Sequence, residues 1–237
     1  KENYNMLLNF LGRDSGFGNN HTSAFFFTES NDIVVIDCPI STFQKLRKTD
    51  LTDHEHIYVL ITHTHGDHIG GLGLFVQHVF FNLHKKVTVV APSKEVANDL
   101  QTVLTIEGNE TEWYQLITSD FLSEENWFVS CVLTEHSPQL AGKCFGYVFI
   151  ISGRAVVYTG DTSTLKPFEP YFPMCNELYV DTSVHYGMIH LKLEDALTDF
   201  IGLSEKGTEI FLMHLDDVDG ASVITSGFPG INVVTVE

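Results

Sequence analysis

The feature that most constrains the fold of this chain is a short apolar strand followed directly by a cluster of potential metal ligands. Val59–Ile61 has the pattern of a buried strand, and His63-Thr64-His65-Gly66-Asp67-His68 follows it directly. The first two histidines lie two positions apart, so in an extended backbone their side chains point the same way. Asp67 and His68 follow where the chain turns into a helix. The segment therefore offers three imidazoles and a carboxylate to one small volume, a donor set that suits zinc and also manganese or iron.

Short β-rich runs alternate with turns and a few helices along the rest of the chain. We expect strands rich in Val, Ile, Phe and Tyr at Met6–Leu11, Ser23–Thr28, Ile33–Asp37, Ile57–Ile61, Val87–Ala91, Trp127–Thr134, Cys144–Ile151, Arg154–Tyr158, Leu178–Val180, Glu209–Met213 and Val233–Val236. We expect helices at Ser41–Thr49, Gly71–Asn82, Ser93–Thr105 and Lys192–Ser204. Ser152-Gly153 is a hairpin signal. This pattern predicts an α/β fold with two sheets packed face to face and covered by helices.

Length and composition predict one globular domain over residues 1–237, with 43% apolar residues to build its core. No apolar run approaches the length of a membrane span. Lys1–Asn5 lacks the features of a signal peptide. The four cysteines form no C-x-x-C pair, which is typical of reduced thiols and predicts a cytoplasmic protein.

The charge balance limits the class of partner. Thirteen basic residues against 31 acidic ones give a formal net charge of −18. A protein that grips a long phosphate backbone usually carries a basic patch, whereas the densest basic stretch here is Lys45–Lys48. Long nucleic acid is therefore an unlikely partner. A small anion attracted by local metal charge fits the composition better.

The H-x-H-x-D-H pattern resembles the signature of the metallo-β-lactamase superfamily, whose fold is an αββα sandwich of two mixed sheets. Thr134–His136, Tyr158–Thr162 and Phe211–His214 match further parts of its ligand set in the expected order. The resemblance implies a dinuclear centre with two Zn²⁺ ions, or Mn²⁺ as the alternative. A first metal would be held by His63, His65 and His136, a second by Asp67, His68 and His214, and Asp161 would bridge the two.

Within that superfamily, three segments resemble the ribonuclease Z-like phosphodiesterase branch. They are the opening strand and loop Leu8–Gly16, the segment Asn20–Ala24, and Gly187–Ala196, in which His190 matches a histidine that assists leaving-group departure. Class B β-lactamases lack the bridging aspartate. Glyoxalase II carries a C-terminal region longer than Leu215–Glu237. The resemblance therefore implies a phosphodiesterase in which Asp67 and His190 are the candidate catalytic residues.

The chain also departs from ribonuclease Z. It lacks the basic, Gly-rich arm that grips tRNA, and the H-E-A-T element of that branch becomes Asp181–Ser183 at best. A compact enzyme without the arm resembles the phage anti-Pycsar enzymes and their bacterial relatives, which are homodimers. That resemblance implies hydrolysis of cyclic nucleotides such as cCMP, cUMP, cAMP or cGMP to nucleoside 5′-monophosphates, in the service of phage evasion of immunity. A tRNA 3′ endonuclease, a thioester or lactone hydrolase, and a non-catalytic binder remain the alternatives.

We also predict roles for several side chains outside the ligand set. The candidate substrate contacts are His21, Thr22, His185 and Tyr186. Asp37, at the end of an apolar strand, either fixes the tautomer of a ligand histidine or is a strand-end turn residue. We expect His54, His56, His78 and His84 to be structural or solvent-exposed.

Overall fold

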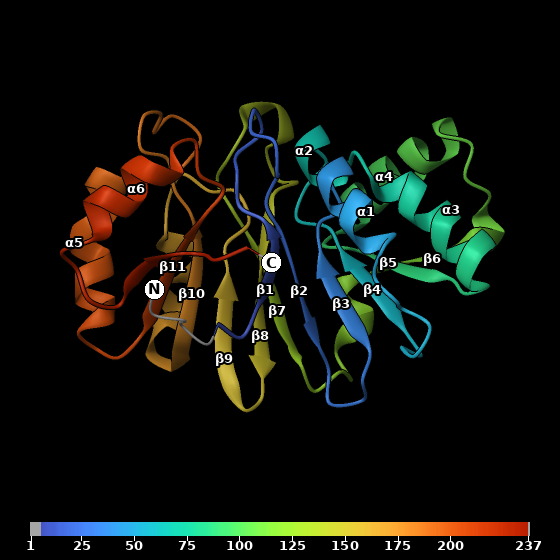
Figure 1. Cartoon of the computed structure of the whole chain (residues 1–237), viewed down its shortest axis with the longest axis horizontal. Coiled ribbons are helices and arrows are strands. Elements are labelled where there is room, and N and C mark those ends of the chain that lie inside the picture. Colours follow the sequence, from blue (N-terminus) through green and yellow to red (C-terminus); the bar gives the residue numbers. More distant parts are fainter. Residues whose placement is uncertain (1–5, 237) are drawn as a thin grey trace.

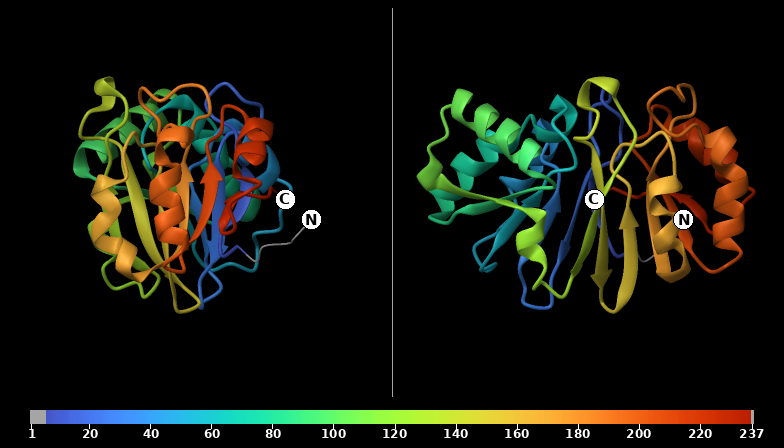
Figure 2. Two further views of the ribbon diagram at one scale, coloured as in Figure 1. Left: turned by 90° about the vertical axis from the view of Figure 1, so that its left-hand side faces the viewer. Right: turned by 180° about the vertical axis from the view of Figure 1, so that it is seen from behind.

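A computed structural model describes residues 6–236 of the chain. Lys1–Asn5, on which the expectation about a signal peptide rests, lies outside the described residues. The chain forms two six-stranded sheets that face each other, with helices on the two outer sides (Figure 1). The views from the side and from behind show the same layering (Figure 2).

The first sheet is built by the N-terminal half. Its strands lie in sequence order, namely β1 (Asn9–Gly12), β2 (Ser23–Phe27), β3 (Ile33–Ile36), β4 (Ile57–Leu60), β5 (Val87–Ala91) and β6 (Tyr114–Thr118). The first three strands pair antiparallel, and β3 to β6 pair parallel.

The second sheet repeats this plan in the C-terminal half. Its strands are β7 (Phe128–Leu133), β8 (Phe145–Ile151), β9 (Arg154–Tyr158), β10 (Cys175–Asp181), β11 (Glu209–Met213) and β12 (Ile231–Val233). Again the first three pair antiparallel and the rest pair parallel. The β8–β9 hairpin turns at Ser152-Gly153, where both residues have positive φ, as the sequence predicts.

Successive side chains of the buried strands point alternately to two different cores, which explains the layered architecture. In β3, Ile33 and Val35 point to the outer core beneath the helices, whereas Val34 and Ile36 point to the core between the sheets. The core between the sheets is largely aromatic, and Phe26 packs against both Trp127 and Phe149. Strands buried on both faces read as continuous apolar runs, which is why β3 and β4 are visible in the sequence.

Helices close the outer faces. The first sheet is covered by α1 (Ile40–Leu46), α3 (Leu72–Leu83) and α4 (Lys94–Ile106), and the second by α5 (Leu193–Ser204), α6 (Val218–Thr225) and the 3₁₀ segment η4 (Lys166–Met174). The short elements α2 (Gly66–Ile69), η1 (Thr111–Trp113), η2 (Ser119–Leu122) and η3 (Pro138–Leu140) lie in connections. No helix within residues 6–236 combines the length and the apolar character that a membrane crossing requires.

β6, α6 and the 3₁₀ segments escape prediction from the sequence, and the reasons are clearest for β6 and α6. β6 is an edge strand that pairs only with β5 among the described strands. Its polar residues Gln115 and Thr118 leave too few apolar residues in sequence for the pattern to predict a strand. α6 contains Gly220 and β-branched residues, which are poor helix formers. It forms because the Asp217 side chain accepts a hydrogen bond from Gly220 N and because Ala221 is buried against the sheet.

The two sheets are joined by hydrogen bonds beside the histidine-rich segment. The buried Tyr147 hydroxyl of β8 donates to the Ile61 carbonyl at 2.6 Å, at the end of β4. Phe145 N donates to the Thr62 carbonyl at 3.0 Å. These bonds hold the carboxyl end of β4 against the second sheet, so side chains from both sheets can meet there.

Replacing Tyr147 by Phe tests this link. The change leaves the buried Ile61 carbonyl without its hydroxyl donor, so we expect the free energy of unfolding to fall by about 1–3 kcal/mol. Denaturant-induced unfolding measures the difference. The matched control is Tyr58→Phe, whose hydroxyl lies a long 3.5 Å from Glu125, and it should cost less than about 0.5 kcal/mol. Equal stability of the Tyr147 variant and the wild type would refute the proposed link.

Candidate metal centre

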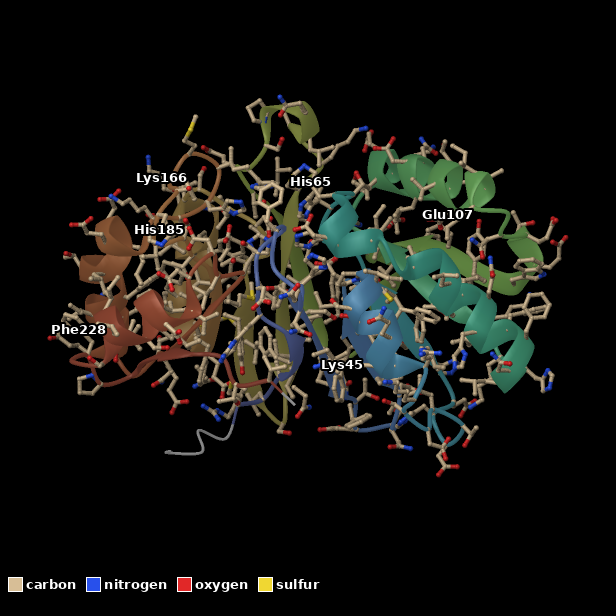
Figure 3. The ribbon with its side chains drawn as sticks, turned by 45° about the horizontal axis from the view of Figure 1, so that its top comes forward. Lys45, His65, Glu107, Lys166, His185 and Phe228 are labelled. Carbon is tan, nitrogen blue, oxygen red and sulfur yellow. The ribbon has the colours of Figure 1, made fainter. Side chains whose placement is uncertain are left out.

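The first group of histidines lies at the carboxyl end of β4. His63 Nε2 lies 3.0 Å from His65 Nδ1, so the two side chains face one volume, as their spacing predicts. His136, which follows β7, brings its Nε2 to 3.4 Å from His65 Nδ1. Together with Asp161, these three residues have potential ligand atoms that all lie within 4.8 Å of one another. Figure 3 looks toward this end of the molecule, with His65 near its middle.

The second group comes from α2 and from the end of β11. α2 begins immediately after His65 and turns Asp67 and His68 into the same volume. Asp67 Oδ2 lies 3.3 Å from His214 Nε2 and 3.4 Å from His68 Nε2. His214 has φ of 54°, which is uncommon for a non-glycine residue. A strained backbone at this position is consistent with a functional demand on where the imidazole points.

Asp161 lies between the two groups. Its Oδ2 is 3.7 Å from His63 Nε2 and 3.5 Å from the Nε2 atoms of His136 and His214. Its Oδ1 is 3.4 Å from His68 Nε2. One carboxylate therefore contacts histidines of both groups, which is the position that a bridging ligand requires.

A glycine makes this position possible. Gly160 precedes Asp161 with φ of 58°, and a Cβ atom there would lie 2.4 Å from the Phe145 carbonyl oxygen and 3.2 Å from the Thr62 side chain. Only glycine fits both the conformation and the space. The Thr134 hydroxyl donates to the Asp161 carbonyl at 2.9 Å and secures the turn from the other side.

Asp37 fulfils both roles that the sequence leaves open. Its φ of 60° makes it the turn residue at the end of β3. Its buried carboxylate also accepts hydrogen bonds from His68 Nδ1 at 2.8 Å, from Thr62 N at 2.8 Å and from the Thr62 hydroxyl at 2.7 Å. The bond from Nδ1 orients the His68 ring and leaves Nε2 directed at Asp67 and Asp161.

His190 stands beside the two groups on the loop that follows β10. Its Nδ1 donates to Asp181 Oδ2 at 2.7 Å, and its ring centroid is 4.9 Å from those of His136 and His214. Asp181 is fully buried, accepts a second bond from Thr162 N at 2.9 Å, and has its Oδ1 3.3 Å from His214 Nδ1. Asp181 therefore orients both His190 and His214.

The loop that carries His190 is fixed to the centre at two places. His136 Nδ1 donates to the Ile189 carbonyl at 2.8 Å, which couples a candidate ligand to the residue before His190. At the other end of the loop, Asp216 accepts bonds from the Ser183 hydroxyl at 2.6 Å and from the backbone of His185 at 3.0 Å. Asp216 lies two residues after His214, so its bonds attach the loop to the segment that carries the last histidine.

The donor set fits divalent metal ions. His68 Nε2 and Asp161 Oδ2 are buried and have no hydrogen-bond partner within the described chain. His68 Nε2 nevertheless lies 3.4 Å from Asp161 Oδ1, and Asp161 Oδ2 lies 3.5 Å from His136 Nε2. Buried polar atoms are normally hydrogen-bonded, so atoms that face one another without such bonds call for a cation between them. Imidazole nitrogen and carboxylate oxygen are the ligands that zinc takes in proteins.

The electrostatics of the centre agree with this conclusion. Burial lowers the pKa of His63 well below its ordinary value, so this imidazole is neutral and its lone pair is available. Burial opposes ionisation of Asp67, but the nearby imidazoles of His214 and His68 outweigh it and hold the pKa of Asp67 well below its usual range. Burial also opposes protonation of His214, yet Asp161, Asp181 and Asp67 raise its pKa to about 10.

The four predicted substrate contacts occupy different environments. Tyr186 is exposed, and His185 pairs with Asp217 at 3.1 Å, both on the loop that carries His190. His21 is half-buried in the loop between β1 and β2. Thr22 is buried, and its hydroxyl accepts a bond from His214 N at 3.0 Å and donates to the Asp14 carbonyl. Thr22 therefore supports the backbone of His214, and its predicted contact with substrate stays a prediction.

Asp181 and Asp216 support the centre in roles that the sequence did not assign to them. Asp181 ends the apolar strand β10, so the rule that drew attention to Asp37 at the end of β3 would have found it. Asp216 carries no such signal, because its partners are a hydroxyl and backbone groups of a loop more than 30 residues away.

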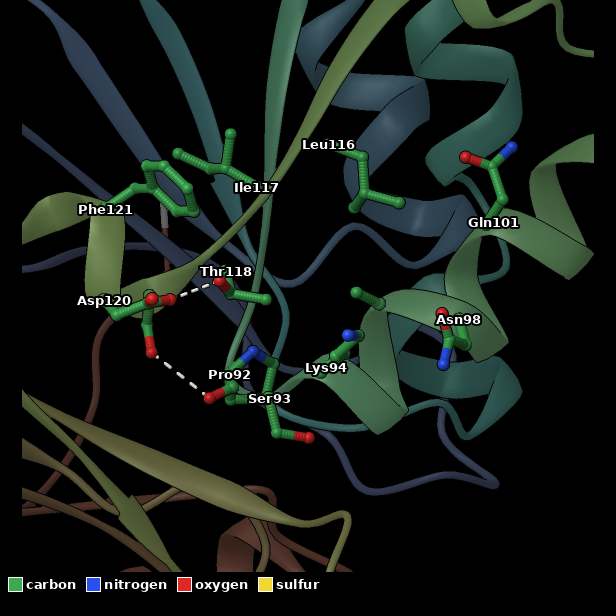
Figure 4. A pocket seen from close by; sticks show the side chains of 12 residues that line it. Pro92, Ser93, Lys94, Asn98, Gln101, Leu116, Ile117, Thr118, Asp120 and Phe121 are labelled. Atoms are coloured by element: carbon green, nitrogen blue, oxygen red, sulfur yellow. Dashed lines mark hydrogen bonds between the residues drawn. The ribbon is translucent and has the colours of Figure 1, made fainter.

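A separate hollow of about 680 Å³ lies beside β6 and the beginning of α4 (Figure 4). Its polar lining includes Lys94, Asn98 and Asp120, and Phe121 lies at its rim. None of the residues that line it is a histidine or a cysteine. Among the described residues, the clusters of potential metal ligands therefore lie at the strand ends and not in this hollow.

Residues 6–231 match the model of a protein family described as Anti-Pycsar protein Apyc1. A protein of that name from Bacillus phage BSP38 is 26% identical over 231 residues, which cover 87% of this chain and 88% of the phage protein. The region of likeness includes all seven candidate ligands.

The chain is also similar to ribonuclease Z from Lactiplantibacillus plantarum, with 30% identity over 153 residues. The match covers 60% of this chain and 48% of that enzyme, so the chain spans about half the length of this relative.

Solved structures support the fold. The metallo-β-lactamase fold protein YhfI from Bacillus subtilis superimposes with a TM-score of 0.74 at 16% identity, over 96% of this chain and 95% of that one. Zn²⁺-bound PqqB from Methylobacterium extorquens gives a TM-score of 0.70 at 11% identity, over 98% of each chain. The predicted αββα sandwich with two mixed sheets is confirmed.

Metal loading of the chelator-treated protein should release protons. Burial opposes protonation of His214, but Asp161, Asp181 and Asp67 outweigh it and raise its pKa to about 10, so this imidazole is protonated at pH 7. A metal needs the lone pair that this proton occupies, so we expect metal binding to release the proton of His214 and the apparent affinity to rise with pH up to about 10. Titration calorimetry in buffers of different ionisation enthalpy counts the protons. Binding without proton release would contradict the assignment.

Proposed function

The chain belongs to the family of Anti-Pycsar protein Apyc1, and on this premise we propose that it is a dinuclear metal-dependent phosphodiesterase that hydrolyses small cyclic nucleotides. The observation that carries the proposal is the convergence of seven side chains from four separated segments on one buried volume. His63, His65 and His136 would hold one metal ion, Asp67, His68 and His214 the other, and Asp161 would contact both.

The charge of the protein favours a small anionic substrate. The formal net charge of −18 opposes the approach of a long phosphate backbone, whereas two divalent cations would make the centre locally positive. A cyclic nucleotide such as cCMP, cUMP, cAMP or cGMP carries one phosphodiester and satisfies both conditions. Its hydrolysis would give a nucleoside 5′-monophosphate.

The bound ions would supply Lewis acidity and an activated water. The protein's own residues would bind, orient and move protons. Asp161 would set the spacing of the two groups of ligands, and Asp37 would fix the ring of His68. His190 would give the proton on its Nε2 to the departing ribose oxygen, because its Nδ1 is engaged with Asp181. Burial opposes protonation of His190, but Asp181 outweighs burial and raises its pKa, which suits a general acid.

Further properties follow the family. We propose Zn²⁺ as the resident metal, with Mn²⁺ as the alternative, since three of the donors in the first group are imidazoles. We also propose a homodimer that acts in the cytoplasm of a phage-infected bacterial cell, where it would remove a cyclic nucleotide immune signal.

A tRNA 3′ endonuclease is the second candidate. The 30% identity to ribonuclease Z over 60% of this chain favours it. The net charge opposes it, and the segment between His68 and Asp161 holds no basic, Gly-rich arm. A thioester or lactone hydrolase uses a similar centre and completes the test panel.

A substrate panel separates these functions. We expect metal-loaded protein to hydrolyse one or more cyclic nucleotides and to leave pre-tRNA and an acyl thioester unchanged, with chromatographic detection of the products. Asp161→Ala should lose at least about 100-fold in activity, because a shared ligand serves both ions. Hydrolysis of the thioester alone would overturn the phosphodiesterase proposal, and full activity of the Asp161 variant would overturn the bridging role.

His190 and its partner give a second, pH-dependent test. His190→Ala should lower kcat about 10²- to 10⁴-fold. In the wild type, activity should fall as pH rises through the raised pKa of His190, because the proton donor is then lost. Asp181→Asn removes the charge that raises this pKa, so the alkaline fall should move to lower pH. An unshifted profile in the Asp181 variant would contradict the role of Asp181 as a positioning residue.

A further inference from the structure

Phe17 is the most exposed large apolar side chain among the described residues, with a relative exposure of 106%. It lies on the loop between β1 and β2, and this loop is firmly held. Gly18 N donates to the Ser15 carbonyl at 2.9 Å, and the Asp14 carboxylate accepts bonds from Asn19 N at 3.1 Å and Asn20 N at 2.9 Å. The aromatic ring is therefore presented to solvent on an ordered loop and not on a loose one.

The same loop forms one wall of the metal centre. A Cβ atom on Gly16, the neighbour of Phe17, would lie 2.9 Å from Asp67 Oδ2. Ser15 N donates to the Leu215 carbonyl at 2.9 Å, directly after His214. Phe17 is thus one residue away from a contact with a candidate ligand.

A second loop with exposed apolar side chains lies at the same end of the molecule. Tyr186 and Met188, with relative exposures of 72% and 92%, lie on the loop that carries His190. In Figure 1 the blue loop after β1 and the orange loop before α5 both rise above the strand ends. Single exposed apolar residues are ordinary, but these three lie on the two loops that contact the candidate ligands.

This arrangement has the chemistry of a nucleotide site. The centre attracts an anion, and a flat heterocycle attached to that anion would extend outward between the loops. An aromatic side chain on a held loop provides a stacking platform with little loss of conformational entropy. Base stacking on one aromatic side chain corresponds to a change in affinity of about 5- to 150-fold.

We propose that Phe17 stacks on the base of the bound nucleotide and so makes the enzyme select nucleotides over other small phosphate esters. The inference rests on the proposed function for its substrate class. It is specific to Phe17, which the sequence alone did not single out.

Binding of a nucleoside 5′-monophosphate and of ribose 5-phosphate to the zinc-loaded protein tests the proposal without any catalysis. The two ligands carry the same phosphate and sugar and differ in the base. We expect the wild type to prefer the nucleotide. Phe17→Ala should bind the nucleotide about 5- to 150-fold more weakly and ribose 5-phosphate unchanged, and Phe17→Trp should keep the preference. Titration calorimetry measures all affinities.

Phe121→Ala is the matched control, because Phe121 is also exposed, at 70%, but lines the separate hollow beside β6. It should leave both affinities unchanged. Equal binding of the two ligands by the wild type would overturn the proposal, as would a Phe17→Ala variant that keeps the preference. A Phe17→Ala variant that changes only the sedimentation coefficient would assign the ring to a contact between subunits and would also overturn it. Base-dependent binding through Phe17 in a protein that hydrolyses no cyclic nucleotide would refute the proposed function and leave this inference standing.

Discussion

The burial of imidazoles and carboxylates in one volume is the interaction on which the rest of this structure depends. Asp37, Asp161 and Asp181 are buried together with His63 and His214, and isolated charges in such a place carry a large desolvation cost. Pairing among them offsets part of that cost. Atoms such as Asp161 Oδ2 nevertheless find no hydrogen bond among the described residues, and divalent cations would supply the missing partner. The strained backbone at Asp37 and His214 is consistent with a centre whose geometry overrides local preference.

The candidate ligands are divided between the two sheets, so the centre depends on the packing of both. β4 of the first sheet leads into His63, and β11 of the second leads into His214, so neither sheet holds a complete set. The core between the sheets and the bonds made by Tyr147 and Phe145 bring the two halves together at the strand ends. In open sheets, ligands generally bind outside the carboxyl ends of the strands. Here two such ends face each other, and packing of the core therefore determines the geometry of the centre.

Local pattern and long-range contact explain what the sequence can and cannot predict. The histidine-rich segment after β4 and the strands buried on both faces are encoded locally, so the layers and the four ligand-type side chains of His63–His68 are visible in advance, whereas His136, Asp161 and His214 are predicted through the family resemblance. α6 is not visible, because its helix-poor residues become helical only when they are capped and packed against the second sheet. The support that Thr22 gives to His214 joins residues 192 positions apart, and no local period reports such a contact.

The candidate metal ligands and the exposed apolar side chains lie in different parts of this molecule. The candidate ligands lie at strand ends that two sheets hold in place, whereas Phe17, Tyr186 and Met188 lie on loops. Those loops are attached to the centre by hydrogen bonds that Phe17, Tyr186 and Met188 do not make with their side chains, such as those of His190 to Asp181 and of Asp216 to Ser183. Their side chains can therefore change which anion is accepted while the ligand atoms stay in place. Proteins with 16% identity or less share this fold, so the arrangement of the strands tolerates wide change in sequence.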